Sequence, residues 1–270
     1  MKYVFGLFVT ALVLLCGTLG FAHSHESISH PEWENFFKKE GVQGTVVFKE
    51  LGRKQYHVYD FKRAQKRKIP ASTFKVIHSL IAYETGTVKT ANHLFKWDGK
   101  PQWLKAWEQD LTFREAIKVS AVPVYKRIAK SIGSQKMKYW LNRLSYGNEK
   151  IGGGIAKFWL SGDLRVSAVE QVDFLEKLYS GDLDASLKGQ VFVRDILPVT
   201  QHKCFEIKGK TGLAFRKDKP HIGWAKAQQR VMFFALNIDI KDKKQYGLRQ
   251  SIVVSLLEQG GLFEESFCAS

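Results

Sequence analysis

Residues 69–80 read IPASTFKVIHSL and place a lysine three positions after a serine, where a helix is predicted to begin. Pro70 is favourable just before a helix, and Phe74, Ile77 and Leu80 recur at helical spacing. One interpretation of the serine and lysine is a helix N-cap followed by a solvated side chain, because serine is a favoured N-cap residue.

A catalytic pair is the other interpretation of Ser72 and Lys75. Positions i and i+3 share one face of a helix, so the hydroxyl and the amine can approach each other. The apolar neighbours favour desolvation, which lowers the pKa of a lysine. A neutral amine can accept the serine proton, or add carbon dioxide to become a carbamate. Because a helix N-terminus also offers N–H groups to an oxyanion, one turn can support acyl transfer through an acyl-serine.

Four short motifs follow in order and supply the further groups that such chemistry needs. They are SAV (120–122), YGN (146–148), FWL (158–160) and KTG (210–212). Each has an ordinary interpretation alone, since YGN is a common turn and a lone tryptophan is more often a core residue. Their joint, ordered occurrence favours the catalytic interpretation, with a second hydroxyl, an indole N–H and a cation for an acidic substrate.

The pattern along the chain predicts an α+β fold. Alternating residues predict strands at 44–50, 55–61, 204–210, 221–227 and 230–240. Helices are expected at 31–38, after Pro70, and at 124–132, 135–144 and 246–258, with capping boxes at 112–115 and 167–170 and a C-terminal glycine at 181. We therefore expect a central antiparallel sheet built from both termini, flanked by helices, with a helical lobe inserted.

The first 22 residues predict a secretory signal peptide. Lys2 is the charged start, residues 4–15 are apolar, and Gly20-Phe21-Ala22 is a small-x-small cleavage site. The apolar run is short for a membrane span and no second one follows, so no stable membrane anchor is expected. Residues 23–270 are then one domain. Cleavage removes Cys16, and the pairing of Cys204 with Cys268 stays open.

The formal net charge of +16 allows two interpretations. A polyanion binder is one, but the basic residues are spread along the chain and cluster only at 62–68. The sequence carries no zinc-finger, RRM or helix-turn-helix signature, so nucleic-acid binding is not expected. An exported basic protein that attracts anionic substrates is the other interpretation.

These motifs resemble the class D (oxacillinase-type) serine β-lactamases. The resemblance spans about residues 30–262 and is carried by PASTFK (70–75), SAV, YGN, FWL, KTG, VPVY (122–125), LRVSAVEQVDFL (164–175) and GLRQ (247–250). SAV in place of an S-D-N triplet argues against class A. The resemblance implies the serine β-lactamase or penicillin-binding-protein-like fold, with a five-stranded antiparallel sheet. It also implies hydrolysis of β-lactam antibiotics in the periplasm.

The resemblance also implies roles for the residues around the serine. Ser72 would be the acylated nucleophile, and Lys75, N-carboxylated by carbon dioxide, would be the general base. Trp159 would donate a hydrogen bond to the carbamate. Ser120 would relay a proton to the β-lactam nitrogen, and Val122 would help to keep the pocket dry.

Substrate binding is implied at the KTG motif. Lys210, Thr211 and Arg249 would hold the substrate carboxylate, and the backbone N–H groups of Ser72 and Leu213 would form the oxyanion hole. No metal or other cofactor is expected beyond carbon dioxide or bicarbonate, and the β-lactam is the expected partner. Whether the chain forms a homodimer stays open.

Two segments depart from the family pattern. Val76-Ile77-His78 replaces a more usual run with proline and asparagine, which bears on packing under Lys75. The segment 213–222 is short, which leaves the substrate range open, for carbapenems especially.

Three alternatives stay open. A penicillin sensor would acylate without turnover, although sensors usually follow several membrane spans. A DD-peptidase acting on peptidoglycan would release D-alanine, although Trp159 and Val122 fit a carbamate base better. An anion-binding protein without catalysis would leave the ordered motifs unexplained.

Overall fold

The computed structural model describes residues 26–214, 218–227 and 229–262. The predicted signal peptide at 1–22, Cys16 and Cys268 lie outside these ranges. Cys204 is disulfide-bonded. None of the helices within these ranges is long and apolar enough to cross a membrane.

Strands from both ends of the chain lie in one sheet, as the sequence predicts. The described residues form a seven-stranded sheet in the order β1-β3-β2-β9-β8-β7-β6. Its strands are β1 (Ser27–Ser29), β2 (Gly44–Glu50), β3 (Tyr56–Tyr59), β6 (Val199–Gln201), β7 (Glu206–Thr211), β8 (Asp218–Ala227) and β9 (Arg230–Asp239), while β4 (Leu94–Phe95) and β5 (Leu111–Thr112) pair separately.

The expectation of a five-stranded sheet is wrong, because the sheet has one further strand at each edge. The five central strands from β3 to β7 are antiparallel, as expected. However, β1 adds in parallel to β3, and β6 adds antiparallel to β7. Both extra strands are three residues long and exposed, so they lack the apolar alternation by which a strand is recognised.

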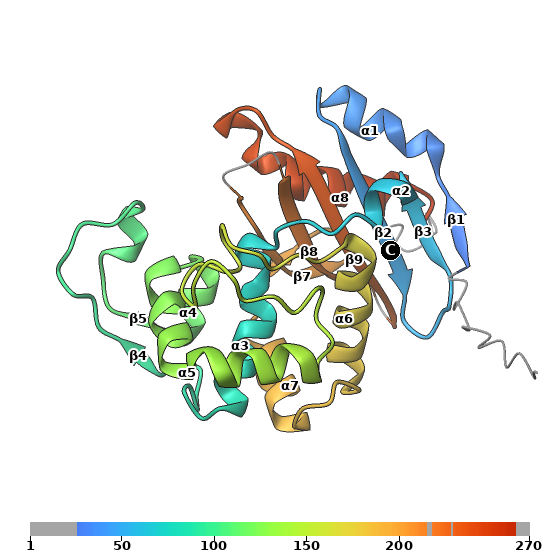
Figure 1. Cartoon of the computed structure of the whole chain (residues 1–270). Helices are drawn as coiled ribbons and strands as arrows, with labels where there is room; N and C mark the ends of the chain where they lie inside the picture. The colour runs from blue at the N-terminus through green and yellow to red at the C-terminus, as the bar shows by residue number, and fades with distance from the viewer. Residues whose placement is uncertain (1–25, 215–217, 228, 263–270) are drawn as a thin grey trace, which may run out of the picture.

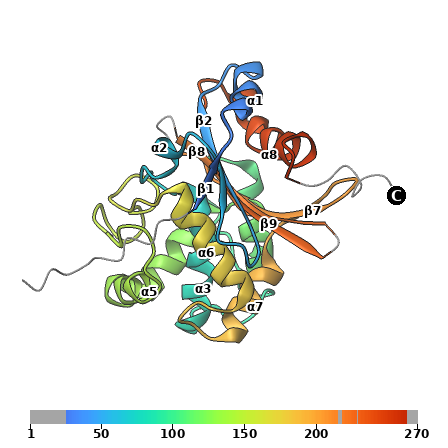
Figure 2. The ribbon, with the colours of Figure 1, turned by 90° about the vertical axis from the view of Figure 1, so that its right-hand side faces the viewer.

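Helices cover both faces of the sheet (Figures 1 and 2). They are α1 (Glu34–Lys39), α2 (Phe61–Ala64), α3 (Lys75–Glu84), α4 (Phe113–Lys118), α5 (Val122–Arg143), α6 (Ala168–Ser180), α7 (Leu187–Ile196) and α8 (Leu248–Gln259). In Figure 2 the sheet is seen nearly on edge, with α1 and α8 on one side and the inserted lobe that includes α3, α5, α6 and α7 on the other.

Strand β9 separates two hydrophobic cores. Phe233 and Ala235 face the larger core, formed with the inserted lobe, whereas Phe234 and Leu236 face the smaller core under α1 and α8. Because successive side chains of a strand point to opposite faces, a strand covered on both sides is apolar throughout. This explains the run RVMFFALNID, which is buried from Val231 to Ile238.

Local signals set several helix ends. Both predicted capping boxes form, at Thr112 with Glu115 and at Ser167 with Glu170. Gly181 ends α6 in the left-handed conformation with φ 85°, where glycine carries no steric penalty. These three predictions are confirmed.

One expected strand end is wrong, and one expected division between helices is confirmed, each for a backbone reason. The strand predicted to reach residue 61 ends at Tyr59, because Asp60 takes a left-handed φ of 52° and caps α2. The division between the helices expected at 124–132 and 135–144 is confirmed, because α5 consists of two helical stretches separated at Gly133, where φ is 77° and ψ is 163°. Glycine permits this conformation.

Candidate active site

Ser72 and Lys75 lie side by side at the start of a buried helix. Ser72 belongs to a 3₁₀ turn, η2 (Ala71–Phe74), and Lys75 is the first residue of α3. The Nζ atom of Lys75 donates a hydrogen bond of 2.8 Å to Ser72 Oγ. The N-cap interpretation of Ser72 is wrong, because no side chain caps η2 or α3.

The environment of Lys75 opposes a positive charge. The side chain is fully buried, and burial, followed by the like charge of Lys210, holds the pKa of its amine well below the ordinary range. The amine lies 5.1 Å from the centre of the Tyr125 ring. The Tyr125 hydroxyl pairs with Ser79 Oγ at 2.8 Å, and Ser79 donates to the Lys75 carbonyl at 2.7 Å.

Three side chains that bear on the predicted site hold buried polar atoms without hydrogen-bond partners among the described residues. They are Ser120 Oγ, Trp159 Nε1 and both ring nitrogens of His78. Trp159 lies against Phe74 and His78, with ring centres 5.7 Å and 5.3 Å apart. A buried polar group without a partner costs about 1–3 kcal/mol, so such a cluster marks a place that a bound group or water completes.

Backbone strain accompanies these groups. Ala71, just before the serine, has φ 49°, and Ser120 has φ 58°. Left-handed φ is uncommon for residues other than glycine and often accompanies functional sites.

The KTG motif contributes a buried cationic corner. Lys210 is buried in β7, and burial together with the charge of Arg249 lowers its pKa to about 7. Arg249, in the second position of α8, donates from its guanidinium to the Gly212 carbonyl at 2.7 Å. This hydrogen bond joins the C-terminal helix to the end of β7. Thr211 ends that strand, and the partly buried Leu213 follows.

Gly212 allows the KTG motif to approach the turn that holds the serine. A Cβ atom at position 212 would lie 2.9 Å from the Pro70 carbonyl oxygen and 2.8 Å from Pro220 Cγ. The Gly212 N–H also donates to the Pro220 carbonyl at 2.7 Å. Any larger residue would therefore push the end of β7 away from η2.

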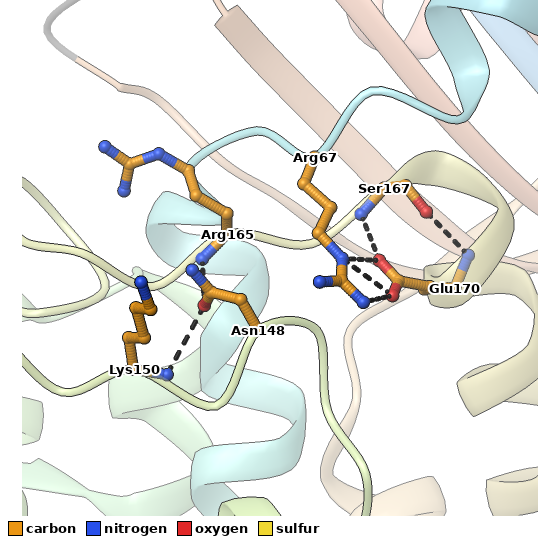
Figure 3. A network of polar contacts seen from close by, with 6 residues as sticks. All are labelled: Arg67, Asn148, Lys150, Arg165, Ser167 and Glu170. Atoms are coloured by element: carbon orange, nitrogen blue, oxygen red, sulfur yellow. Dashed lines mark hydrogen bonds and ion pairs between the residues drawn. The ribbon is translucent and has the colours of Figure 1, made fainter.

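The YGN motif fixes the loop that carries Trp159 (Figure 3). Asn148 donates from Nδ2 to the Asp163 carbonyl at 2.9 Å, and its Oδ1 accepts from the Arg165 N–H at 2.8 Å. Lys68 and Val166 exchange two backbone hydrogen bonds of 2.8 Å, and next to them Arg67 pairs with Glu170. Residues 148–166 are thereby held against the segment that leads to Ser72.

A second buried network lies under the serine turn. The Tyr146 hydroxyl donates to Gln171 at 2.9 Å, Gln171 Nε2 donates to Thr73 Oγ1 at 3.1 Å, and Thr73 donates to the Pro70 carbonyl at 2.7 Å. Sequence reasoning missed Gln171 and Thr73 as supports, although both lie inside the segments PASTFK and LRVSAVEQVDFL. Their signal was a polar residue within an apolar helical pattern.

The predicted site residues are connected to one another by different kinds of interaction. Ser72 and Lys75 are hydrogen-bonded, while Lys210 acts on Lys75 through its charge and Arg249 acts on Lys210 in the same way. Trp159 joins through ring packing. Within the described residues no hydrogen bond ties Ser120 to this group. Val122, the first residue of α5, is partly buried and packs on the larger core. Sequence reasoning missed Tyr125 beside the Lys75 amine.

Comparison with known proteins identifies the family. A model of the penicillin-binding protein transpeptidase domain matches residues 43–258. The crystal structure of FUS-1 (OXA-85), a class D β-lactamase from Fusobacterium nucleatum subsp. polymorphum, matches with a TM-score of 0.83 and 35% identity, covering 88% of this chain and 100% of that one. The chain belongs to the class D β-lactamases.

Curated relatives agree. This class D β-lactamase is 42% identical over 236 residues to β-lactamase OXA-10 of Pseudomonas aeruginosa, covering 85% of this chain and 89% of the relative. It is 36% identical over 257 residues to β-lactamase OXA-48 of Klebsiella pneumoniae, covering 94% and 97%. The predicted fold and activity are confirmed: the enzyme is a hydrolase of β-lactams that acts through an acyl-serine. In the described ranges no group of three or more metal-ligating side chains could hold a metal ion.

The Asn148 clamp generates a prediction about the Trp159 loop. Asn148→Ala removes three hydrogen bonds with backbone groups, so we expect a loss of about 1–2 kcal/mol in the free energy of unfolding and faster amide exchange at residues 149–166. Lys150→Ala is the matched control, because Lys150 takes part through its backbone N–H and its side chain is exposed. Equal melting temperatures and exchange rates in the two variants would contradict the clamp.

Proposed function

We propose that Ser72 is the serine acylated by β-lactams and that Lys75, in N-carboxylated form, is its general base. The observation that carries this proposal is the fully buried amine 2.8 Å from Ser72 Oγ, with its pKa held low by burial. A solvated lysine would stay charged at neutral pH and could not accept the serine proton.

Carboxylation needs a neutral amine, which this pocket favours. The amine nitrogen bonds to the carbon of carbon dioxide, one amine proton leaves to solvent, and an anionic carbamate remains. When present, the carbamate supplies a carboxylate that can accept the proton of Ser72. Burying such an anion is costly unless donors surround it. Trp159 Nε1 is a buried donor without a partner among the described residues, which fits the carbamate.

The remaining residues complete acyl transfer. Ser72 Oγ bonds to the β-lactam carbonyl carbon as the amide C–N bond breaks, and Ser120 passes a proton to the leaving nitrogen. The backbone N–H groups of Ser72 and Leu213 stabilise the oxyanion. Water then hydrolyses the acyl-serine. Support for the role of Ser120 comes from its buried hydroxyl, which has no partner in the described part of the chain.

Lys210, Thr211 and Arg249 bind the carboxylate of the substrate, and Val122 limits water at the Lys75 pocket. The buried Lys210 and the partly buried Arg249 support this assignment, because each has a lowered pKa that an anionic ligand would restore.

The enzyme is exported to the periplasm and loses residues 1–22, leaving one catalytic domain from residue 23. Support comes from the charged start, the apolar run and the small-x-small site of the N-terminal segment. N-terminal sequencing of the exported protein checks this cleavage, and an intact Met1 on that protein would contradict it.

The assignment of Ser72 predicts a loss of hydrolysis. We expect Ser72→Ala to reduce penicillin turnover on the order of 10⁴-fold or more, because it removes the nucleophile. The exposed Ser134→Ala is the control and should leave turnover unchanged. Added bicarbonate should raise the activity of the unmodified enzyme. Full hydrolysis by Ser72→Ala would overturn the proposal, and a stable acyl-protein without product release would identify a sensor instead.

The lowered pKa of Lys210 predicts the pH dependence of substrate binding. With a pKa of about 7 in the free enzyme, Lys210 is cationic below this pH and loses its charge above it. We expect KM to rise by up to about tenfold per pH unit above that value, because the substrate carboxylate loses its partner. Lys210→Arg should remove this rise, since a guanidinium stays charged. A KM for the unmodified enzyme that is flat across this range would contradict the assignment.

A further inference from the structure

His78 is a fully buried titratable residue to which the reaction above gives no role. It follows Lys75 by three positions on α3, so the two side chains share one face of the helix. Its ring lies 5.2 Å from the Tyr125 ring and 5.3 Å from the Trp159 ring, between centres. Since the Lys75 amine lies 5.1 Å from that same Tyr125 ring, His78 borders the pocket of the amine.

Packing alone does not account for a histidine at this position. Neither ring nitrogen has a hydrogen-bond partner among the described residues, although the site is fully buried. The ring is surrounded by Phe74, Tyr125 and Trp159, where a phenylalanine would pack without an unpaired polar atom. A buried imidazole of this kind needs a partner that the described residues do not provide.

We propose that His78 is a positioning residue that donates a ring N–H hydrogen bond to the carbamate on Lys75, beside the bond from Trp159. This inference rests on the proposed carboxylation of Lys75. A carbamate has two oxygens and a full negative charge, so it can accept from both donors, and in a buried pocket it requires them. The ring nitrogens of His78 and the indole N–H of Trp159, which have no partner among the described residues, are then explained by one bound group.

The charges around the ring agree with this role. Burial and the positive charge of Lys75 lower the pKa of His78 to about 3, so the ring is neutral and keeps one N–H donor and one lone pair. Carboxylation converts the neutral Lys75 amine into an anionic carbamate. This anion attracts the N–H of the neutral His78 ring. His78 should therefore strengthen the binding of carbon dioxide without touching the β-lactam.

The affinity for carbon dioxide tests the inference apart from activity. The enzyme is stripped of carbon dioxide, ¹³C-bicarbonate is added, and the carbamate signal is followed by NMR, with Lys75→Ala identifying it. We expect His78→Phe, which keeps a ring but loses the donor, to raise the half-saturating concentration about tenfold or more. His78→Asn, which keeps an N–H donor, should stay within about threefold of the unmodified enzyme. Trp159→Phe is the positive control for a lost donor.

The outcomes separate this inference from the proposed function. Absence of the carbamate signal in the unmodified enzyme overturns the carboxylation of Lys75, and this inference with it. A signal whose half-saturation is unchanged in a folded His78→Phe overturns the role of His78 alone. If that variant fails to fold, the role of His78 is tested by the ¹⁵N resonances of its ring in the unmodified enzyme. They should shift on loading with carbon dioxide, and unchanged resonances overturn the inference.

Discussion

Burial of the Lys75 amine beside Ser72 Oγ is the constraint on which the site depends. A lysine in water is charged and inert, whereas this one lies at the start of a helix buried continuously from Lys75 to Ala82. Such a helix must be central, with neighbours on every side. The inserted lobe and the sheet supply these neighbours. The architecture of the inserted lobe thus sets the protonation state of a single side chain.

Distant segments reach this helix through a few close contacts. Gly212 lets the end of β7 pack against the serine turn, because a side chain at this position would clash with neighbouring groups. Asn148 and Gln171 hold the other side by hydrogen bonds to backbone and side-chain groups. The motifs spread along the sequence therefore divide into residues with chemical groups at the site and residues that fix their positions.

Much of the fold could be predicted because its signals are local. Alternation predicted β3, and side chain–backbone caps predicted the starts of α4 and α6. Features set by tertiary contacts could not be predicted in this way: the 3₁₀ turn that holds Ser72 and the outer strands. The sequence marked His78 as a departure from the family pattern. Its burial without a hydrogen-bond partner among the described residues could not be predicted, because it depends on residues from α5 and the Trp159 loop.

The most direct test of this account is the pKa of the Lys75 amine in enzyme freed of carbon dioxide. It can be followed by NMR of protein labelled at lysine Cε, with the resonance assigned by its loss in Lys75→Ala. We expect this resonance to titrate well below the ordinary value of 10.5, apart from the exposed lysines, and to report a neutral amine at the pH of catalysis. A Lys75 resonance that titrates with the exposed lysines near 10.5 would contradict the account.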